Sequence, residues 1–268
     1  MKKYAVYPAL ALAGGAAAFA LRLAQNRTGF EAGTGLPVAG NLWGRLLAGL
    51  LVVIILACLP LVRKLPAEAE GDSPDFHGAF STQAPLLLTV LVSGVFLFAV
   101  SGLLELAAGL GLLPGGSAGR LSLLLGGLTL VSAGCLFSAL PACRRSAPEE
   151  RRSVSGNLLL LPVGYLVVRL VTAYRTESIN PVLEAYYIDL LALVFLTLAF
   201  YRLSSFAFRA GQTRRFLLYA LPAVVLCLAA LADSRSLYDT LFFAGGGVTV
   251  LGFFLLRLDA LADAPSDL

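Results

Sequence analysis

Two charged residues, Arg169 and Asp189, lie inside long apolar runs of this sequence. An ionisable side chain in membrane hydrocarbon is costly, so it usually belongs to a structural ion pair or to a functional site. Only a few residues join the two runs, which predicts antiparallel neighbouring helices. At 1.5 Å per residue, Arg169 should lie about 10 Å and Asp189 about 12 Å from the same end of these helices. We therefore expect the two side chains to be able to meet.

Three more polar residues are predicted at a similar depth. Tyr165 shares one helical face with Arg169, and Tyr186 lies one turn from Asp189. Glu105 lies in the same half of a third apolar run. An arginine close to carboxylates can bind an anionic or zwitterionic solute. These five residues are therefore the candidate ligand site, a polar vestibule at one face of the membrane.

Two structural interpretations compete with a ligand site. A paired Arg169 and Asp189 would neutralise each other and fix the packing of their helices without any ligand. Alternatively, the long side chain of Arg169 could extend to the membrane interface. Further charged residues at the same predicted end of their runs are Arg22, Asp233, Arg235 and Asp239. Their presence favours the vestibule, because the polar residues inside the apolar runs concentrate in this same half.

Catalytic, cofactor-binding and metal-binding motifs are missing from the sequence. The one histidine, His77, lies in a predicted loop beside acidic residues, where we expect it to be solvated. There is no HExxH, P-loop or GxGxxG motif, and no lysine lies within an apolar run. The cysteines predict neither a disulfide framework nor a zinc site, and small packing residues are the simpler interpretation. We expect no enzymatic activity, no cofactor and no metal.

The composition is that of an integral membrane protein. Hydrophobic residues make up 58% of the chain and charged residues only 13%, whereas a soluble domain is about one quarter charged. The 268 residues have room for about eight spans of ~20 residues, the length that crosses a bilayer. The expected fold is an all-α, polytopic bundle forming a single domain over residues 1–268. Its spans are predicted at 5–24, 46–62, 85–113, 120–141, 157–176, 181–203, 215–232 and 237–257.

The first span could instead be a signal peptide, because Ala18-Phe19-Ala20 resembles a small-x-small cleavage site. Its apolar stretch is longer than a typical signal core, and seven more spans follow, so a retained helix is the preferred interpretation. In the last span, Gly245-Gly246-Gly247 should let helices approach closely. The alternative is that this triplet unwinds the helix, as in some transporters.

Charge distribution predicts the orientation of the bundle. The net charge is +4, but the basic residues lie in pairs at the ends of apolar runs, which is typical of topology signals rather than of a nucleic-acid surface. Most arginines and every lysine fall on the side of the two termini. We therefore expect both termini in the cytoplasm, in the plasma membrane of a bacterial type of cell. The acidic connection at residues 66–83 is predicted to be a solvated linker.

The first functional hypothesis is a small-solute transporter or solute-binding membrane component that uses the five-residue site. Its expected partners are the lipid bilayer and an anionic or zwitterionic solute. The second hypothesis is a scaffold, sensor or assembly factor that binds partners through basic stretches at residues 144–152 or 202–215. An intramembrane enzyme acting through Asp189, Glu105 and Arg169 comes third. A solvent-connected cavity at the site would favour the first hypothesis, whereas a packed Arg169–Asp189 contact would oppose it.

Overall fold

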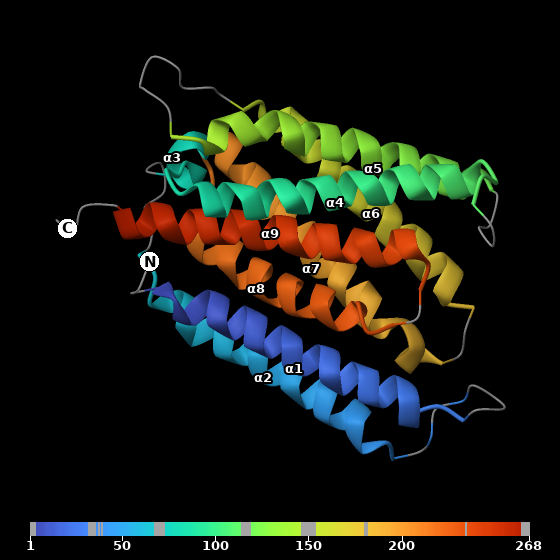
Figure 1. Ribbon diagram of the computed structural model, residues 1–268. Helices are drawn as coiled ribbons and strands as arrows, with labels where there is room; N and C mark the ends of the chain where they lie inside the picture. The colour runs from blue at the N-terminus through green and yellow to red at the C-terminus, as the bar shows by residue number, and fades with distance from the viewer. Residues whose placement is uncertain are drawn as a thin grey trace.

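The protein is an all-helical bundle (Figure 1). A computed structural model describes residues 4–31, 36, 38, 40–66, 73–113, 119–145, 154–179, 182–233 and 235–263. The long helices are α1 (Val6–Thr28), α2 (Leu42–Arg63), α4 (Pro85–Gly109), α5 (Arg120–Ala139), α6 (Gly156–Glu177), α7 (Leu183–Ala207), α8 (Thr213–Ala230) and α9 (Leu237–Asp263). The short ones are α3 (Phe76–Phe80) and the 3₁₀ helix η2 (Leu140–Cys143).

The expected all-α bundle with about eight candidate membrane spans is confirmed. Within the described ranges, 8 helices are long and apolar enough to cross a membrane. The largest boundary difference is at α9, which continues to Asp263. Helix α2 begins earlier than predicted, at Leu42, because Asn41 caps it; α4 ends earlier, at Gly109; and α1 and α7 end later, at Thr28 and Ala207. Helix α1 begins and α9 ends at the same end of the bundle (Figure 1), which we call the terminal end. The opposite end, where α8 turns into α9, is the far end.

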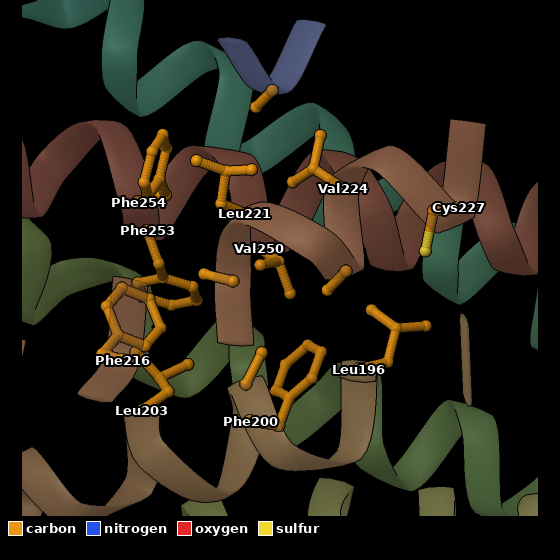
Figure 2. Packing of buried hydrophobic residues seen from close by; sticks show 14 of the residues in the cluster. Leu196, Phe200, Leu203, Phe216, Leu221, Val224, Cys227, Val250, Phe253 and Phe254 are labelled. Atoms are coloured by element: carbon orange, nitrogen blue, oxygen red, sulfur yellow. The ribbon is translucent and has the colours of Figure 1, made fainter. Parts of the chain in front are cut away.

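Helices α8 and α9 form the centre of the bundle. Helix α8 packs against α1, α2, α7 and α9, and α9 packs most extensively against α4 (Figure 1). The core between α7, α8 and α9 is built from leucine, valine and phenylalanine side chains (Figure 2). The outward faces are apolar too, as shown by Val53, which is 62% exposed, and Phe96, which is 59% exposed. Apolar residues on both the inner and the outer faces suit a bundle surrounded by lipid.

Helix α1 is an integral part of this bundle, which is the arrangement expected of a retained helix. Its small residues Ala11, Gly14, Gly15 and Ala18 are buried. A Cβ atom at Gly15 would lie 2.3 Å from Leu228 Cδ1, so α1 and α8 pack closely here and a larger residue would require the Leu228 side chain to move.

Glycine also sets the distance between α4 and its neighbours. A Cβ atom at Gly94 would lie 2.5 Å from the Thr249 backbone nitrogen, and one at Gly245 would lie 2.5 Å from the Phe98 backbone nitrogen. Between α4 and α5, a Cβ atom at Gly126 would lie 2.6 Å from the Leu106 backbone nitrogen. The Gly245 triplet therefore serves packing. The unwinding alternative is wrong, because α9 is helical from Leu237 to Asp263.

The segment before α4 is not the solvated linker that its composition predicts. Residues 67–72 lie outside the described part of the chain, but residues 76–82 are largely buried at the terminal end. The ring of Phe80 contacts those of Phe206, Phe216 and Phe253 at centroid distances of 5.1, 5.8 and 5.4 Å. Burial of this aromatic cluster outweighs the exposure that nearby acidic residues suggest. His77 is buried as well, and its Nδ1 lies 2.8 Å from the carbonyl oxygen of Ala142, so the expected solvated histidine is also wrong.

Thr82 fastens this segment to the last helix, and its replacement should be measurable. Its hydroxyl donates to Asp259 Oδ2 at 2.5 Å and accepts from the Ala84 backbone N–H at 3.0 Å. Thr82→Val keeps the shape but removes both bonds, so we expect a loss of about 2 kcal/mol in the free energy of unfolding. Thr89→Val is the matched control, because the exposed Thr89 bonds only to a carbonyl of its own helix. Equal stability of the two variants would contradict this role.

Candidate functional site

Arg169 on α6 is buried at the far half of the bundle, where it is 6% exposed. Its Nη1 donates to Glu105 Oε2 at 2.8 Å and to the Tyr165 hydroxyl at 2.9 Å. Its Nη2 donates to Asp239 Oδ1 at 2.7 Å. The guanidinium also lies over the Phe242 ring, 4.0 Å from its centroid. One arginine thus joins helices α4, α6 and α9.

The Arg169 group is largely satisfied by these contacts. Two carboxylates, Glu105 and Asp239, balance the guanidinium charge at hydrogen-bonding distance, which is how a desolvated charge is tolerated. The Tyr165 hydroxyl is hydrogen-bonded to that of Thr129 at 2.6 Å, which extends the network to α5. Such an arrangement fixes helix packing without needing a ligand.

The expected contact between Arg169 and Asp189 is wrong. Helices α6 and α7 are neighbours as predicted, but Arg169 and Asp189 form ion pairs with different residues. Asp189 is 4% exposed and forms an ion pair with Arg235 in the α8–α9 turn, while Arg169 pairs with carboxylates of α4 and α9. The depth of each residue along its helix follows from the sequence, but its rotation toward a third helix does not.

Three of the five predicted site residues therefore come together, namely Glu105, Tyr165 and Arg169. Tyr186 is buried on α7, and none of the described hydrogen bonds joins it to the Arg169 group. Asp189 belongs to a second charged group at the same end.

This second group is centred on Arg22, the most deeply buried arginine of the described residues at 1% exposed. Its Nε and Nη2 donate to Asp233 at 2.7 and 3.3 Å. Its Nη1 donates to Gln25 Oε1 at 3.0 Å and to the backbone carbonyl of Glu184 at 2.8 Å. Asn26 Nδ2 also donates to Asp233, at 2.7 Å. Helix α1 is thereby fastened to α7 and to the α8–α9 turn.

The α8–α9 turn connects both groups. Asp233 pairs with Arg22 and with Arg235, and Arg235 pairs with Asp189. Asp239, in the first turn of α9, pairs with Arg169. Burial lowers the pKa of the Arg235 guanidinium, and the nearby Asp239 carboxylate opposes that shift. The sequence placed these charges at one end of their helices but gave no sign of which would pair.

An open cleft lies beside the Arg22 group, with a volume of about 430 Å³. Its walls are the end of α1, the first two turns of α2 and the first turns of α7. The lining residues are Gln25, Gly40, Asn41, Gly44, Arg45, Ala48, Leu183, Glu184 and Tyr187. Both charged members of this lining, Arg45 on α2 and Glu184 on α7, are exposed.

The contacts of Glu184 place its carboxylate at the wall of the cleft. Its Oε2 accepts from Gln25 Nε2 at 3.4 Å and would lie 3.8 Å from a Cβ atom at Gly44. The same Cβ atom would lie 2.8 Å from Gln25 Nε2, so glycine at position 44 leaves room for the Gln25 amide that donates to the carboxylate. No ion pair between Arg45 and Glu184 is present among the described contacts, so the cleft offers one cation and one anion on facing helices.

Comparison with known proteins finds no match: no family model, curated protein or solved structure resembles the chain. The site must therefore be interpreted from its chemistry. No cluster of three or more histidine, cysteine, aspartate or glutamate side chains able to hold a metal occurs among the residues described. The cleft, with one exposed cation, one exposed anion and a volume of about 430 Å³, has the size and the chemistry to bind a small polar molecule.

Proposed function

We propose that the protein is a solute-binding membrane component, of the transporter class, and that its ligand site is the cleft between α1, α2 and α7. The observation that carries this proposal is the exposed Arg45 and Glu184 on facing helices of a cleft of about 430 Å³. The Arg169 group then has a structural role, since its cation is already balanced by Glu105 and Asp239.

The charges of the cleft favour a zwitterionic solute. A guanidinium on one wall recognises phosphate or carboxylate, and a carboxylate on the other recognises an ammonium group. Tyr187 and Gln25 add an aromatic face and an amide. With both termini in the cytoplasm, as the distribution of lysine and arginine predicts, the cleft opens to the outer side of a plasma membrane.

The packing around the cleft suggests how binding would move the protein. The far-end part of α1 is held to α7 and to the α8–α9 turn by Arg22 and Asn26. Helix α2 has its main contacts with α1 and α8. A ligand that draws Arg45 toward Glu184 would therefore move the first turns of α2 toward α7, while the rest of the far end stays fixed.

The scaffold alternative has less support. Two arginines of the basic stretch at 202–215 serve the fold: Arg202 lies over the rings of Tyr201 and Tyr219, and Arg214 donates to the Leu65 carbonyl. The other stretch falls mostly on residues 146–153, which lie outside the described part of the chain.

Ligand-dependent thermal stability tests the proposal. Purified protein in nanodiscs should be stabilised by a zwitterionic solute such as phosphoethanolamine, by about 2.7 kcal/mol at a concentration one hundred times the Kd. Ala48→Phe fills the cleft and should abolish the shift, and Arg45→Gln should reduce it. Val53→Phe, on the exposed outer face of the same helix, is the control and should respond as wild type. A shift that persists in Ala48→Phe would place the ligand elsewhere.

A further inference from the structure

Below the cleft, apolar residues of α2 and α7 lie near one another. On α2, Gly44 and Ala48 line the cleft, and Leu51 and Ile55 follow on the same helical face at intervals of three and four residues. These deeper residues line a second, smaller space of about 20 Å³.

Helix α7 likewise has one residue at the cleft and an apolar residue one turn below it. Tyr187 lines the cleft, and Leu191, one turn deeper, lines the smaller space together with Pro222 and Leu226 of α8. The smaller space has no polar lining residue. Leu191 is 38% exposed and therefore presents apolar surface to the bilayer. Where α2 and α7 face each other there is thus a polar part, the cleft, at the far end and an apolar part below it.

The polar part lies at the ends of two candidate membrane spans, where lipid headgroups are expected. It is formed by the first turns of two membrane-spanning helices, α2 and α7. Trp43, 40% exposed, lies beside Arg45 at the start of α2, as is typical of residues at the membrane interface. The apolar part begins one to two turns deeper, where acyl chains lie.

We propose that the ligand is a membrane lipid with a zwitterionic headgroup. Its phosphate binds Arg45, its ammonium group binds Glu184, and one acyl chain lies over the exposed side chain of Leu191. This inference rests on the proposed function, because it assigns a ligand class to the same cleft. A free zwitterion would use only the polar part, whereas a lipid uses both parts and enters from the bilayer.

Titration of delipidated protein, followed by native mass spectrometry, tests this assignment. Three probes are compared: phosphatidylethanolamine, phosphatidylglycerol and glycerophosphoethanolamine, the last being a headgroup without chains. We expect one phosphatidylethanolamine to be retained in preference to phosphatidylglycerol. Glycerophosphoethanolamine should bind more weakly than phosphatidylethanolamine. Leu191→Trp obstructs only the apolar part, so it should weaken lipid binding by about tenfold and leave the chainless headgroup unaffected.

A second variant tests headgroup recognition. Glu184→Gln keeps the backbone carbonyl that accepts from Arg22 but removes the charge that attracts ammonium and repels anionic lipid. It should reduce the preference for phosphatidylethanolamine over phosphatidylglycerol by about fivefold, the effect of one exposed ion pair. Val53→Trp is the control for bulk on the lipid-facing side of α2. It should change neither the affinity for phosphatidylethanolamine nor the preference over phosphatidylglycerol.

The outcomes separate this inference from the proposed function. Binding of glycerophosphoethanolamine that depends on Arg45, with no lipid preference and no effect of Leu191→Trp, would overturn the lipid assignment and leave a soluble zwitterion as ligand. Failure of all three probes to bind wild type would overturn both. Equal weakening by Leu191→Trp and Val53→Trp would mean that the retained lipid is only annular, which also overturns the assignment.

Discussion

Arg169→Gln should lower the free energy of unfolding by about 3–5 kcal/mol, the cost of removing one member of a buried ion pair. The substitution leaves Glu105 and Asp239 facing each other without the cation that lies 2.8 and 2.7 Å from them. It also removes the guanidinium from the Phe242 ring. The loss can be measured by unfolding in mixed micelles of increasing SDS content.

Two further variants show whether the loss comes from unpaired charge. Arg175→Gln removes an exposed arginine from the same helix and should change stability by less than about 0.5 kcal/mol. Arg169→Gln combined with Glu105→Gln should cost less than the sum of the single changes, because it removes one of the unpaired carboxylates. If Arg169→Gln were as stable as Arg175→Gln, the group would not be structural. A solute that stabilised wild type but not folded Arg169→Gln would show that Arg169 belongs to the ligand site.

Gly126→Ala should cost about 3 kcal/mol, at the upper end of the usual effect of overpacking. The added Cβ would lie 2.6 Å from the Leu106 backbone nitrogen and 3.0 Å from the Gly102 carbonyl oxygen, and backbone atoms cannot turn aside as a side chain can. Helices α4 and α5 would have to separate. The same reasoning applies to Gly245→Ala, which forces α9 away from α4.

The adjacent residue provides the control. A Cβ atom at Gly127 meets nothing within 4 Å, so Gly127→Ala should be neutral or stabilise the helix by up to about 1 kcal/mol. Both variants can be compared in the same SDS titration. Equal effects of the two substitutions would show that helix propensity, and not close approach of α4 and α5, explains these glycines.

The spans could be predicted because hydropathy depends on the local sequence alone. Eight apolar runs became eight helices in the described chain, and the small residues of α1 and α9 lie where helices meet. The short helix α3 was missed because acidic residues nearby concealed its two phenylalanines. Phe76 and Phe80, four residues apart, were the available signal.

The candidate site could be predicted only in part. Depth along a helix follows from counting residues, which brought Glu105, Tyr165 and Arg169 together correctly. Which face of α7 meets which neighbour depends on tertiary packing, so Asp189 was assigned the wrong partner. The cleft was not predicted, because Arg45 and Glu184 lie at helix ends, where charged residues are ordinary in membrane proteins.

The position of the α8–α9 turn in the chain has a consequence for biosynthesis. Arg22 emerges from the ribosome early, but Asp233, its ion-pair partner, follows 211 residues later. Arg169 likewise precedes Asp239 by 70 residues. During insertion, Arg22 enters the membrane before Asp233, and Arg169 enters with Glu105 but before Asp239, so both groups are completed only when the last hairpin arrives. A nascent chain that stops before Asp233 would carry uncompensated charge in the bilayer, and membrane quality control would have a physical basis for removing it.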